Sequence, residues 1–90
     1  MTIIHVSNKA RKQLEKAPQI VRLNFNDWYS RVMQDGIMET RKVKGYHDEP
    51  LQGKRKGERS IRLNKQWRAI YIEINGIIEV EITEVTPHEY

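Results

Sequence analysis

The chain has 90 residues with a formal net charge of +4, which suits one domain spanning residues 1–90 and favours a polyanionic partner. It contains no cysteine, which excludes disulfides and thiolate chemistry and makes the reducing cytoplasm the expected compartment. No apolar run approaches the ~20 residues of a membrane helix, so we expect a soluble protein with no membrane partner.

The first half of the chain has apolar residues at helical spacing. Residues 3–6 form a short extended start, after which Ser7 can cap a helix. Pro18 interrupts this helix and suits the first turn of a second, which Gly36 can end. These features predict a helical hairpin. Its apolar residues are Ala10, Leu14 and Ala17 in the first helix and Val21, Phe25, Trp28 and Val32 in the second.

A long loop is expected in the middle of the chain. Residues 37–44 could hold one more helical turn, whereas residues 45–57 carry three glycines and Pro50 among polar side chains. Loops of this length are often functional.

The second half of the chain alternates as strands do, over residues 60–64, 67–75 and 77–85, with Asn75-Gly76 as a hairpin turn. The fold class is therefore predicted as α+β, with the helical hairpin packed on one face of a small antiparallel sheet. The opposite face would remain available to solvent or ligand. The side chains expected to pack on the second helix are Ile70, Ile72, Ile74, Ile78, Val80 and Ile82.

Seven basic residues gather in the loop and in the strands that follow it. Such a cluster could bind several phosphates, and the alternative is a solvated charged surface. Arg68 opens an otherwise apolar strand face, where an unpaired charge is costly, so it needs a buried carboxylate partner or a polar cleft. The cluster consists of Lys54, Arg55, Lys56, Arg59, Arg62, Lys65 and Arg68.

The C-terminal sequence TPHEY offers a second candidate site. His88 has a pKa suited to proton transfer near neutrality, and Tyr90 can stack on a base, although a frayed terminus would have the same sequence. His47 lies beside two acidic residues and could equally be a loop histidine bonded to a carboxylate. The three histidines are isolated in the sequence, so we expect no metal site and no cofactor.

The order of these segments resembles the RelE/ParE superfamily of bacterial toxins, most closely its HigB-like branch. The resemblance spans nearly the whole chain. It is carried by Leu51-x-Gly53, Arg59-Ser60-Ile61-Arg62-Leu63, Trp67-Arg68-Ala69-Ile70-Tyr71 and Val85-x-x-His88-x-Tyr90.

The resemblance implies a RelE-like fold and the toxin of a type II toxin-antitoxin system. Its partners would be a cognate antitoxin, expected to be a small helix-turn-helix protein, and the ribosome with its mRNA. Most RelE-like and HigB-like members cleave mRNA in the ribosomal A site, whereas ParE-like members poison DNA gyrase. A gyrase-poisoning toxin and a non-toxic nucleic-acid-binding module therefore remain as alternatives.

Site residues follow from the same resemblance, by position. The arginine of the family's aromatic-Arg-x-x-Tyr strand falls on Arg68, and the basic residue of the preceding strand falls on Arg62. The family's C-terminal acid, base or stacking group falls on His88 or Tyr90, and a loop histidine of some HigB-like members falls nearest to His47.

These positions predict a metal-independent endoribonuclease in which the ribose 2′-OH attacks the adjacent phosphorus. Arg68 and Arg62 would stabilise charge on the phosphate. His88 is the first choice for proton transfer, His47 is the second, and Tyr90 would position or stack an unpaired base. The residues expected to dock ribosomal RNA are Lys54, Arg55, Lys56, Arg59 and Lys65.

Overall fold

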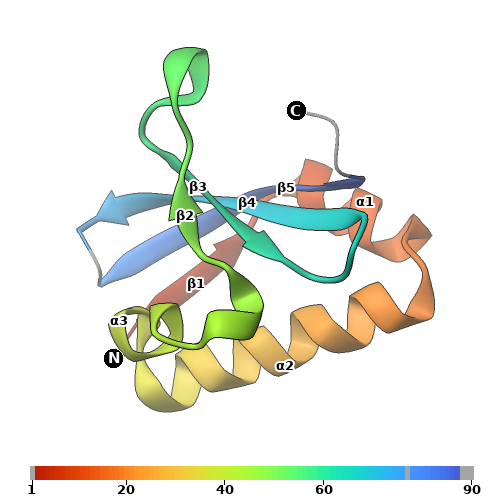
Figure 1. Cartoon of the computed structure of the whole chain (residues 1–90), viewed down its shortest axis with the longest axis horizontal. Helices are drawn as coiled ribbons and strands as arrows, with labels where there is room; N and C mark the ends of the chain where they lie inside the picture. Colours follow the sequence, from red (N-terminus) through yellow and green to blue (C-terminus); the bar gives the residue numbers. More distant parts are fainter. Residues whose placement is uncertain (1, 77, 88–90) are drawn as a thin grey trace.

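A computed structural model describes residues 2–76 and 78–87, and their fold is α+β, as expected (Figure 1). Helices and strands follow the order predicted from the sequence, with additional short elements. They are β1 (Ile3–Val6), α1 (Asn8–Lys16), α2 (Gln19–Asp35), α3 (Ile37–Arg41), η1 (Lys44–Tyr46), β2 (Glu49–Pro50), η2 (Gly53–Arg55), β3 (Glu58–Arg62), β4 (Trp67–Asn75) and β5 (Glu79–Pro87).

The predicted helix ends are confirmed. Ser7 caps α1, since its Oγ accepts a hydrogen bond of 3.0 Å from the Ala10 amide. Gly36 ends α2 with a φ of 86°, a left-handed conformation that glycine adopts without a steric penalty. Helix α3 follows directly, as the expected extra helical turn. In the described part of the chain, no helix is long and apolar enough to cross a membrane.

The sheet has the strand order β1-β5-β4-β3-β2. Strands β3, β4 and β5 form the predicted antiparallel meander. The additional strand β2 is antiparallel to β3, but β1 pairs with β5 in parallel, so the sheet is mixed. Residues 3–6 were expected only to be extended. Four residues contain too little pattern to indicate a pairing partner so far along the chain.

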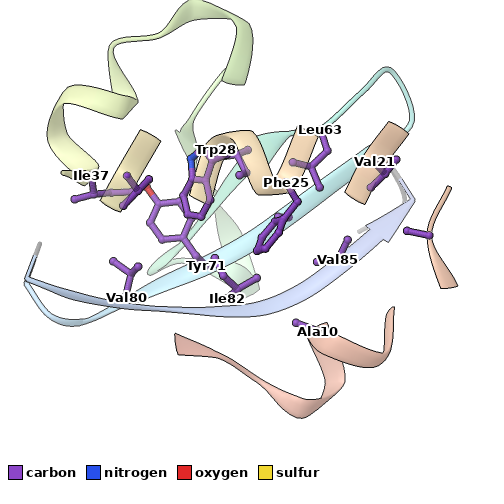
Figure 2. Close-up of a cluster of buried hydrophobic side chains, with 14 residues drawn as sticks. Ala10, Val21, Phe25, Trp28, Ile37, Leu63, Tyr71, Val80, Ile82 and Val85 are labelled. Atoms are coloured by element: carbon purple, nitrogen blue, oxygen red, sulfur yellow. The ribbon is translucent and has the colours of Figure 1, made fainter. Parts of the chain in front are cut away.

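Helix α2 covers one face of the sheet, and the core lies between them (Figure 2). The α2 side chains in this core are those predicted: Val21, Phe25, Trp28 and Val32. The sheet contributes Ile61, Ala69, Tyr71, Val80, Ile82 and Val85, and Leu63 is added by the turn after β3.

The predicted core face of β4 was wrong. Ala69 and Tyr71 point to α2, whereas Ile70 is buried outside this core cluster and Ile74 is half exposed. Both faces of β4 carry apolar residues, so alternation alone could not choose between them. Tyr71 occupies the inner face because its ring packs against Trp28, with ring centroids 5.8 Å apart.

Helix α1 lies along β5, beyond the point where β1 ends. Its buried residue Ala10 belongs to the same core cluster as the α2 side chains. The Val85 amide donates to Oε1 of Gln13 at 2.8 Å, and Oγ of Ser7 donates to the Thr83 carbonyl at 3.3 Å. Side chains around α1 therefore replace the backbone partners that this edge of β5 lacks. The apolar side chains predicted for the first helix reach the core: Ala10 and Ala17 are buried in it, and Leu14 packs against it.

Residues 45–57 are less irregular than expected. They include η2 and the two-residue strand β2, which pairs with β3 through Glu49 with Ser60 and Pro50 with Arg59. Proline has no backbone N–H, but Pro50 is tolerated here because β2 is an edge strand with a strand partner on one side only. This pairing holds the basic loop against the sheet.

Candidate nucleic-acid interface

Arg62 and Arg68 are brought together as a cross-strand pair of β3 and β4. Their neighbours Ile61 and Ala69 form the adjacent pair and belong to the core under α2. Because side chains alternate along strands, the two arginines fall on the opposite side of the sheet, which we call the far face. In the backbone register, the two positions expected to act on one phosphate are therefore direct neighbours.

Arg68 is buried, with an exposed fraction of 9%. Its Nη1 donates to the Asn64 carbonyl at 3.3 Å, and within residues 2–76 and 78–87 no carboxylate forms an ion pair with it. A guanidinium has five N–H donors, so this side chain retains donor capacity for an anion. The sequence left two environments open for Arg68, a buried carboxylate partner or a polar cleft. The described residues provide no such carboxylate.

The turn between β3 and β4 is fixed by Asn64. Its Oδ1 accepts hydrogen bonds of 2.8 Å from the amides of both Gln66 and Trp67. This arrangement places Lys65 on an exposed turn beside the arginine pair. The position is compatible with the expected phosphate contact.

The end of β5 meets the same part of the sheet. Thr86 pairs with Arg68, and Pro87 pairs with Trp67. The candidate residues His88 and Tyr90 lie outside the described residues, although His88 follows Pro87 directly in the sequence.

The basic loop is not uniformly exposed. Arg55 donates to Oε1 of Glu58 at 2.8 Å and also pairs with Glu84 of β5. The hydrogen bond to Glu58, and then that to Glu84, raise the pKa of the Arg55 guanidinium. Lys54 and Lys56, on either side, are exposed. Arg55 therefore anchors η2 to the sheet, while the two lysines face solvent.

Arg59 lies on the α2 side of the sheet, where it pairs with a carboxylate that the sequence analysis did not single out. The side chain of Asp48 is only 1% exposed and accepts a hydrogen bond of 2.7 Å from Nε of Arg59. It also accepts one of 2.6 Å from the hydroxyl of Tyr71. A tyrosine on a buried strand needs a hydrogen-bond partner, and that requirement was the available signal for Asp48.

Arg41 extends this network from α3. Its Nε donates to the Tyr71 hydroxyl at 3.1 Å and lies 3.9 Å from Oδ2 of Asp48, and its Nη2 pairs with Glu73. Burial, followed by the Asp48 carboxylate, raises the pKa of Tyr71 above its ordinary value of 10.0. The hydroxyl therefore stays protonated and can donate to Asp48.

His47 adjoins the buried carboxylate in sequence but has a different environment. Its side chain is 58% exposed, and Nε2 lies 3.5 Å from Oε2 of Glu49. It adopts a left-handed conformation with a φ of 49°, at the end of η1. His47 therefore lies beside a carboxylate, which is one of the two interpretations that the sequence left open. Across residues 2–76 and 78–87, no three His, Asp or Glu side chains form a group that could hold a metal ion.

Solved structures of bacterial toxins share this fold. YafQ from E. coli strain BL21(DE3) aligns with a TM-score of 0.75 and 17% identity, covering 97% of this chain and 93% of that one. A YoeB/ParE toxin from Agrobacterium tumefaciens aligns with a TM-score of 0.75 and 15% identity, covering 98% and 100%. The E. coli DinJ-YafQ complex aligns with a TM-score of 0.73 and 16% identity, covering 98% and 94%.

These similarities confirm the RelE-like fold that the sequence motifs predicted. They do not single out the HigB-like branch. Searches against family models and against curated protein sequences find no match.

Proposed function

We propose that this chain is the toxin of a type II toxin-antitoxin system and cleaves mRNA bound to the ribosome. The observation that carries the proposal is the pairing of Arg62 with Arg68, whose buried guanidinium has no carboxylate partner in the described residues. A phosphate would supply the missing acceptors in the planar geometry that arginine prefers. The fold shared with YafQ and the YoeB/ParE toxin supports the toxin class.

An antitoxin is the expected protein partner. The structure of YafQ with DinJ supports such a partner for a chain of this fold. We propose a small helix-turn-helix protein for this role and the HigB-like branch for the toxin, on the sequence motifs alone. The ribosome as a partner places the proposed activity in the cytoplasm.

In the proposed reaction, the ribose 2′-oxygen forms a bond to the adjacent phosphorus while the bond to the 5′-oxygen breaks. One group accepts the 2′-OH proton and another donates a proton to the leaving oxygen. Arg62 and Arg68 stabilise the charge that develops on the phosphate oxygens. His88 is proposed for proton transfer, with His47 as the second candidate, and Tyr90 for stacking on a base.

No metal is required by this scheme, since two guanidinium groups provide the positive charge. The ribosome would orient the mRNA, which allows a small protein to act with few catalytic groups. Exposed Lys54, Lys56 and Lys65 are proposed to contact ribosomal RNA. Arg55 and Arg59 are each held by carboxylates, so their proposed contribution to RNA binding is smaller.

The test is ribosome-dependent cleavage of a defined mRNA, with 5′ ends mapped at nucleotide resolution. The wild-type protein should cut within the A-site codon, and Arg68→Ala should slow cleavage by about 10²- to 10³-fold, as for loss of one donor to a developing oxyanion. Arg11→Ala, on the exposed side of α1, is the control with the same charge change. Intact mRNA together with gyrase-linked DNA breaks would replace the proposal with a ParE-like activity.

Metal independence has its own test. Cleavage should survive chelation of metal ions from the purified protein, with magnesium supplied separately to keep the ribosomes intact. A requirement for zinc or manganese under those conditions would exclude this mechanism. Growth that continues during induction without an antitoxin would instead favour a non-toxic nucleic-acid-binding module.

A further inference from the structure

A hollow of about 320 Å³ adjoins the arginine pair at the end of β3. It lies between α2 and the segment that leads into β2. Arg62, the last residue of β3, lines the hollow and pairs with Arg68 of β4, so the hollow and the arginine pair meet at the end of β3. Among its lining residues are Asn24, Asp27, Val43, Tyr46, Arg62 and Leu63.

The α2 side of the hollow offers hydrogen-bond acceptors. Asn24 is fixed because its Nδ2 donates to the Leu63 carbonyl at 2.6 Å, which leaves its Oδ1 as an acceptor. Asp27, one turn further along α2, is exposed and forms no ion pair within residues 2–76 and 78–87. Its carboxylate can therefore accept two parallel hydrogen bonds from a ligand.

One aromatic and two aliphatic side chains also line the hollow. Tyr46 is partly buried and packs against the core, which restricts the movement of its ring. Leu63, which is buried, and Val43, which is partly buried, also line the hollow. An aromatic side chain beside an acceptor-bearing rim suits a planar heterocycle with donor groups along one edge.

We propose that this hollow binds a guanine base of RNA, next to the phosphate held by Arg62 and Arg68. This inference rests on the proposed function. Guanine presents two neighbouring donors, N1–H and the N2 amino group, on its Watson-Crick edge, and one carboxylate can accept both. Adenine and cytosine each place an acceptor beside their amino group, and uracil flanks its N3–H with two carbonyls, so each would set a lone pair against Asp27.

Binding can be measured without the ribosome. The full ¹⁵N-labelled chain is titrated with GMP, AMP, CMP and UMP at one ionic strength, so that the phosphate is the same and only the base differs. GMP should bind most tightly and shift the amide resonances of Tyr46, Leu63 and Asn64. Equal affinities for the four nucleotides would overturn the inference.

Variants of Asp27 and Tyr46 assign the groups. Asp27→Asn should lower the affinity for GMP by about 5- to 150-fold, as for loss of one bidentate base contact, and leave CMP and UMP nearly unchanged. Glu15→Gln removes an exposed charge from α1 and should preserve the preference for GMP. Tyr46→Ala should weaken all four nucleotides, whereas Tyr46→Phe retains the ring and should bind like wild type. A GMP preference that survives Asp27→Asn would refute the assignment.

Cleavage mapping separates this inference from the proposed function. Wild-type cuts should show guanine at one fixed position, and Asp27→Asn should lose that preference while still cutting mRNA. A GMP preference without any mRNA cleavage would support the base site and overturn only the ribonuclease proposal. Cleavage with no guanine preference would overturn the base site alone.

Discussion

Asp48→Ala tests whether one buried carboxylate holds the segment before β2 on the sheet. The Asp48 side chain is 1% exposed and accepts hydrogen bonds from Tyr71 and Arg59 at 2.6 and 2.7 Å. Alanine would leave the Tyr71 hydroxyl without this acceptor and the Arg59 charge without its counterion. Since the side chain of Arg59 is 23% exposed, water would compensate part of the loss.

Removing one partner of a buried ion pair costs about 3 to 5 kcal/mol, and the partial exposure of Arg59 places this pair near the lower limit. We therefore expect the free energy of unfolding to fall by about 3 kcal/mol, out of the ~5 to 15 kcal/mol typical of a domain. The melting temperature should fall by about 12 to 24 °C for a chain of this size. Urea titration followed by tryptophan fluorescence, to which the buried Trp28 beside Tyr71 contributes, gives the free energy of unfolding.

The matched control is Glu49→Ala, which removes the neighbouring carboxylate. Glu49 is 51% exposed and lies 3.5 Å from His47, so its loss should cost less than about 1 kcal/mol. In the double variant Asp48→Ala with Arg59→Met, the total cost should be smaller than the sum of the two single costs. If Asp48→Ala cost no more than Glu49→Ala, the network would not stabilise the fold and this reasoning would fail.

The raised pKa of Tyr71 predicts that the protein is sensitive to alkaline pH. Near pH 10 the unfolded chain releases the hydroxyl proton of Tyr71, while the folded chain retains it. The free energy of unfolding should therefore fall by about 1.4 kcal/mol per pH unit above pH 10. Tyr71→Phe should lack this component, and identical slopes for the two proteins would contradict the prediction. Arg68→Met should leave the free energy of unfolding unchanged or raise it, because it removes a buried charge without a carboxylate partner in the described residues. A loss of about 3 kcal/mol in urea titration would instead show that the charge stabilises the fold. Replacing Lys54 and Lys56 by Gln should reduce the slope of log affinity for ribosomes against log salt by about 0.7 to 0.9 for each phosphate that is no longer neutralised, and an unchanged slope would assign both lysines to a solvated surface. Deleting residues 88–90 should slow cleavage by about 10²- to 10⁴-fold with little change in melting temperature, and full activity at saturating protein would exclude these residues from catalysis.

The helices were predictable because their signals are local. Ser7 and Gly36 mark helix ends through their own backbone and side-chain chemistry, and the α2 stripe repeats at helical spacing. The hairpin of β4 and β5 was likewise marked by Asn75-Gly76. Each of these signals acts between residues close together in the chain.

The inner face of β4 and the Asp48 network were missed for a different reason. Ile70 and Tyr71 are both fully buried, on opposite sides of one strand, so hydrophobicity could not rank them. The choice depends on Trp28 and Asp48, which are distant in sequence and meet Tyr71 only in the folded chain. The arginine pair, in contrast, was identified because the family motif fixes both of its positions.

The pairing of β1 with β5 affects the order in which the protein can be completed during synthesis. Ile3–Val6 is translated early, yet its partner is Glu79–Ile82, which is translated after β4 and all the helices. β1 therefore cannot join the sheet until β5 has left the ribosome, and such long-range closure is slow. β5 also supplies Thr86, the cross-strand neighbour of Arg68. The surface proposed to attack mRNA on the ribosome is thus assembled only after β5 has emerged from the ribosome that made it.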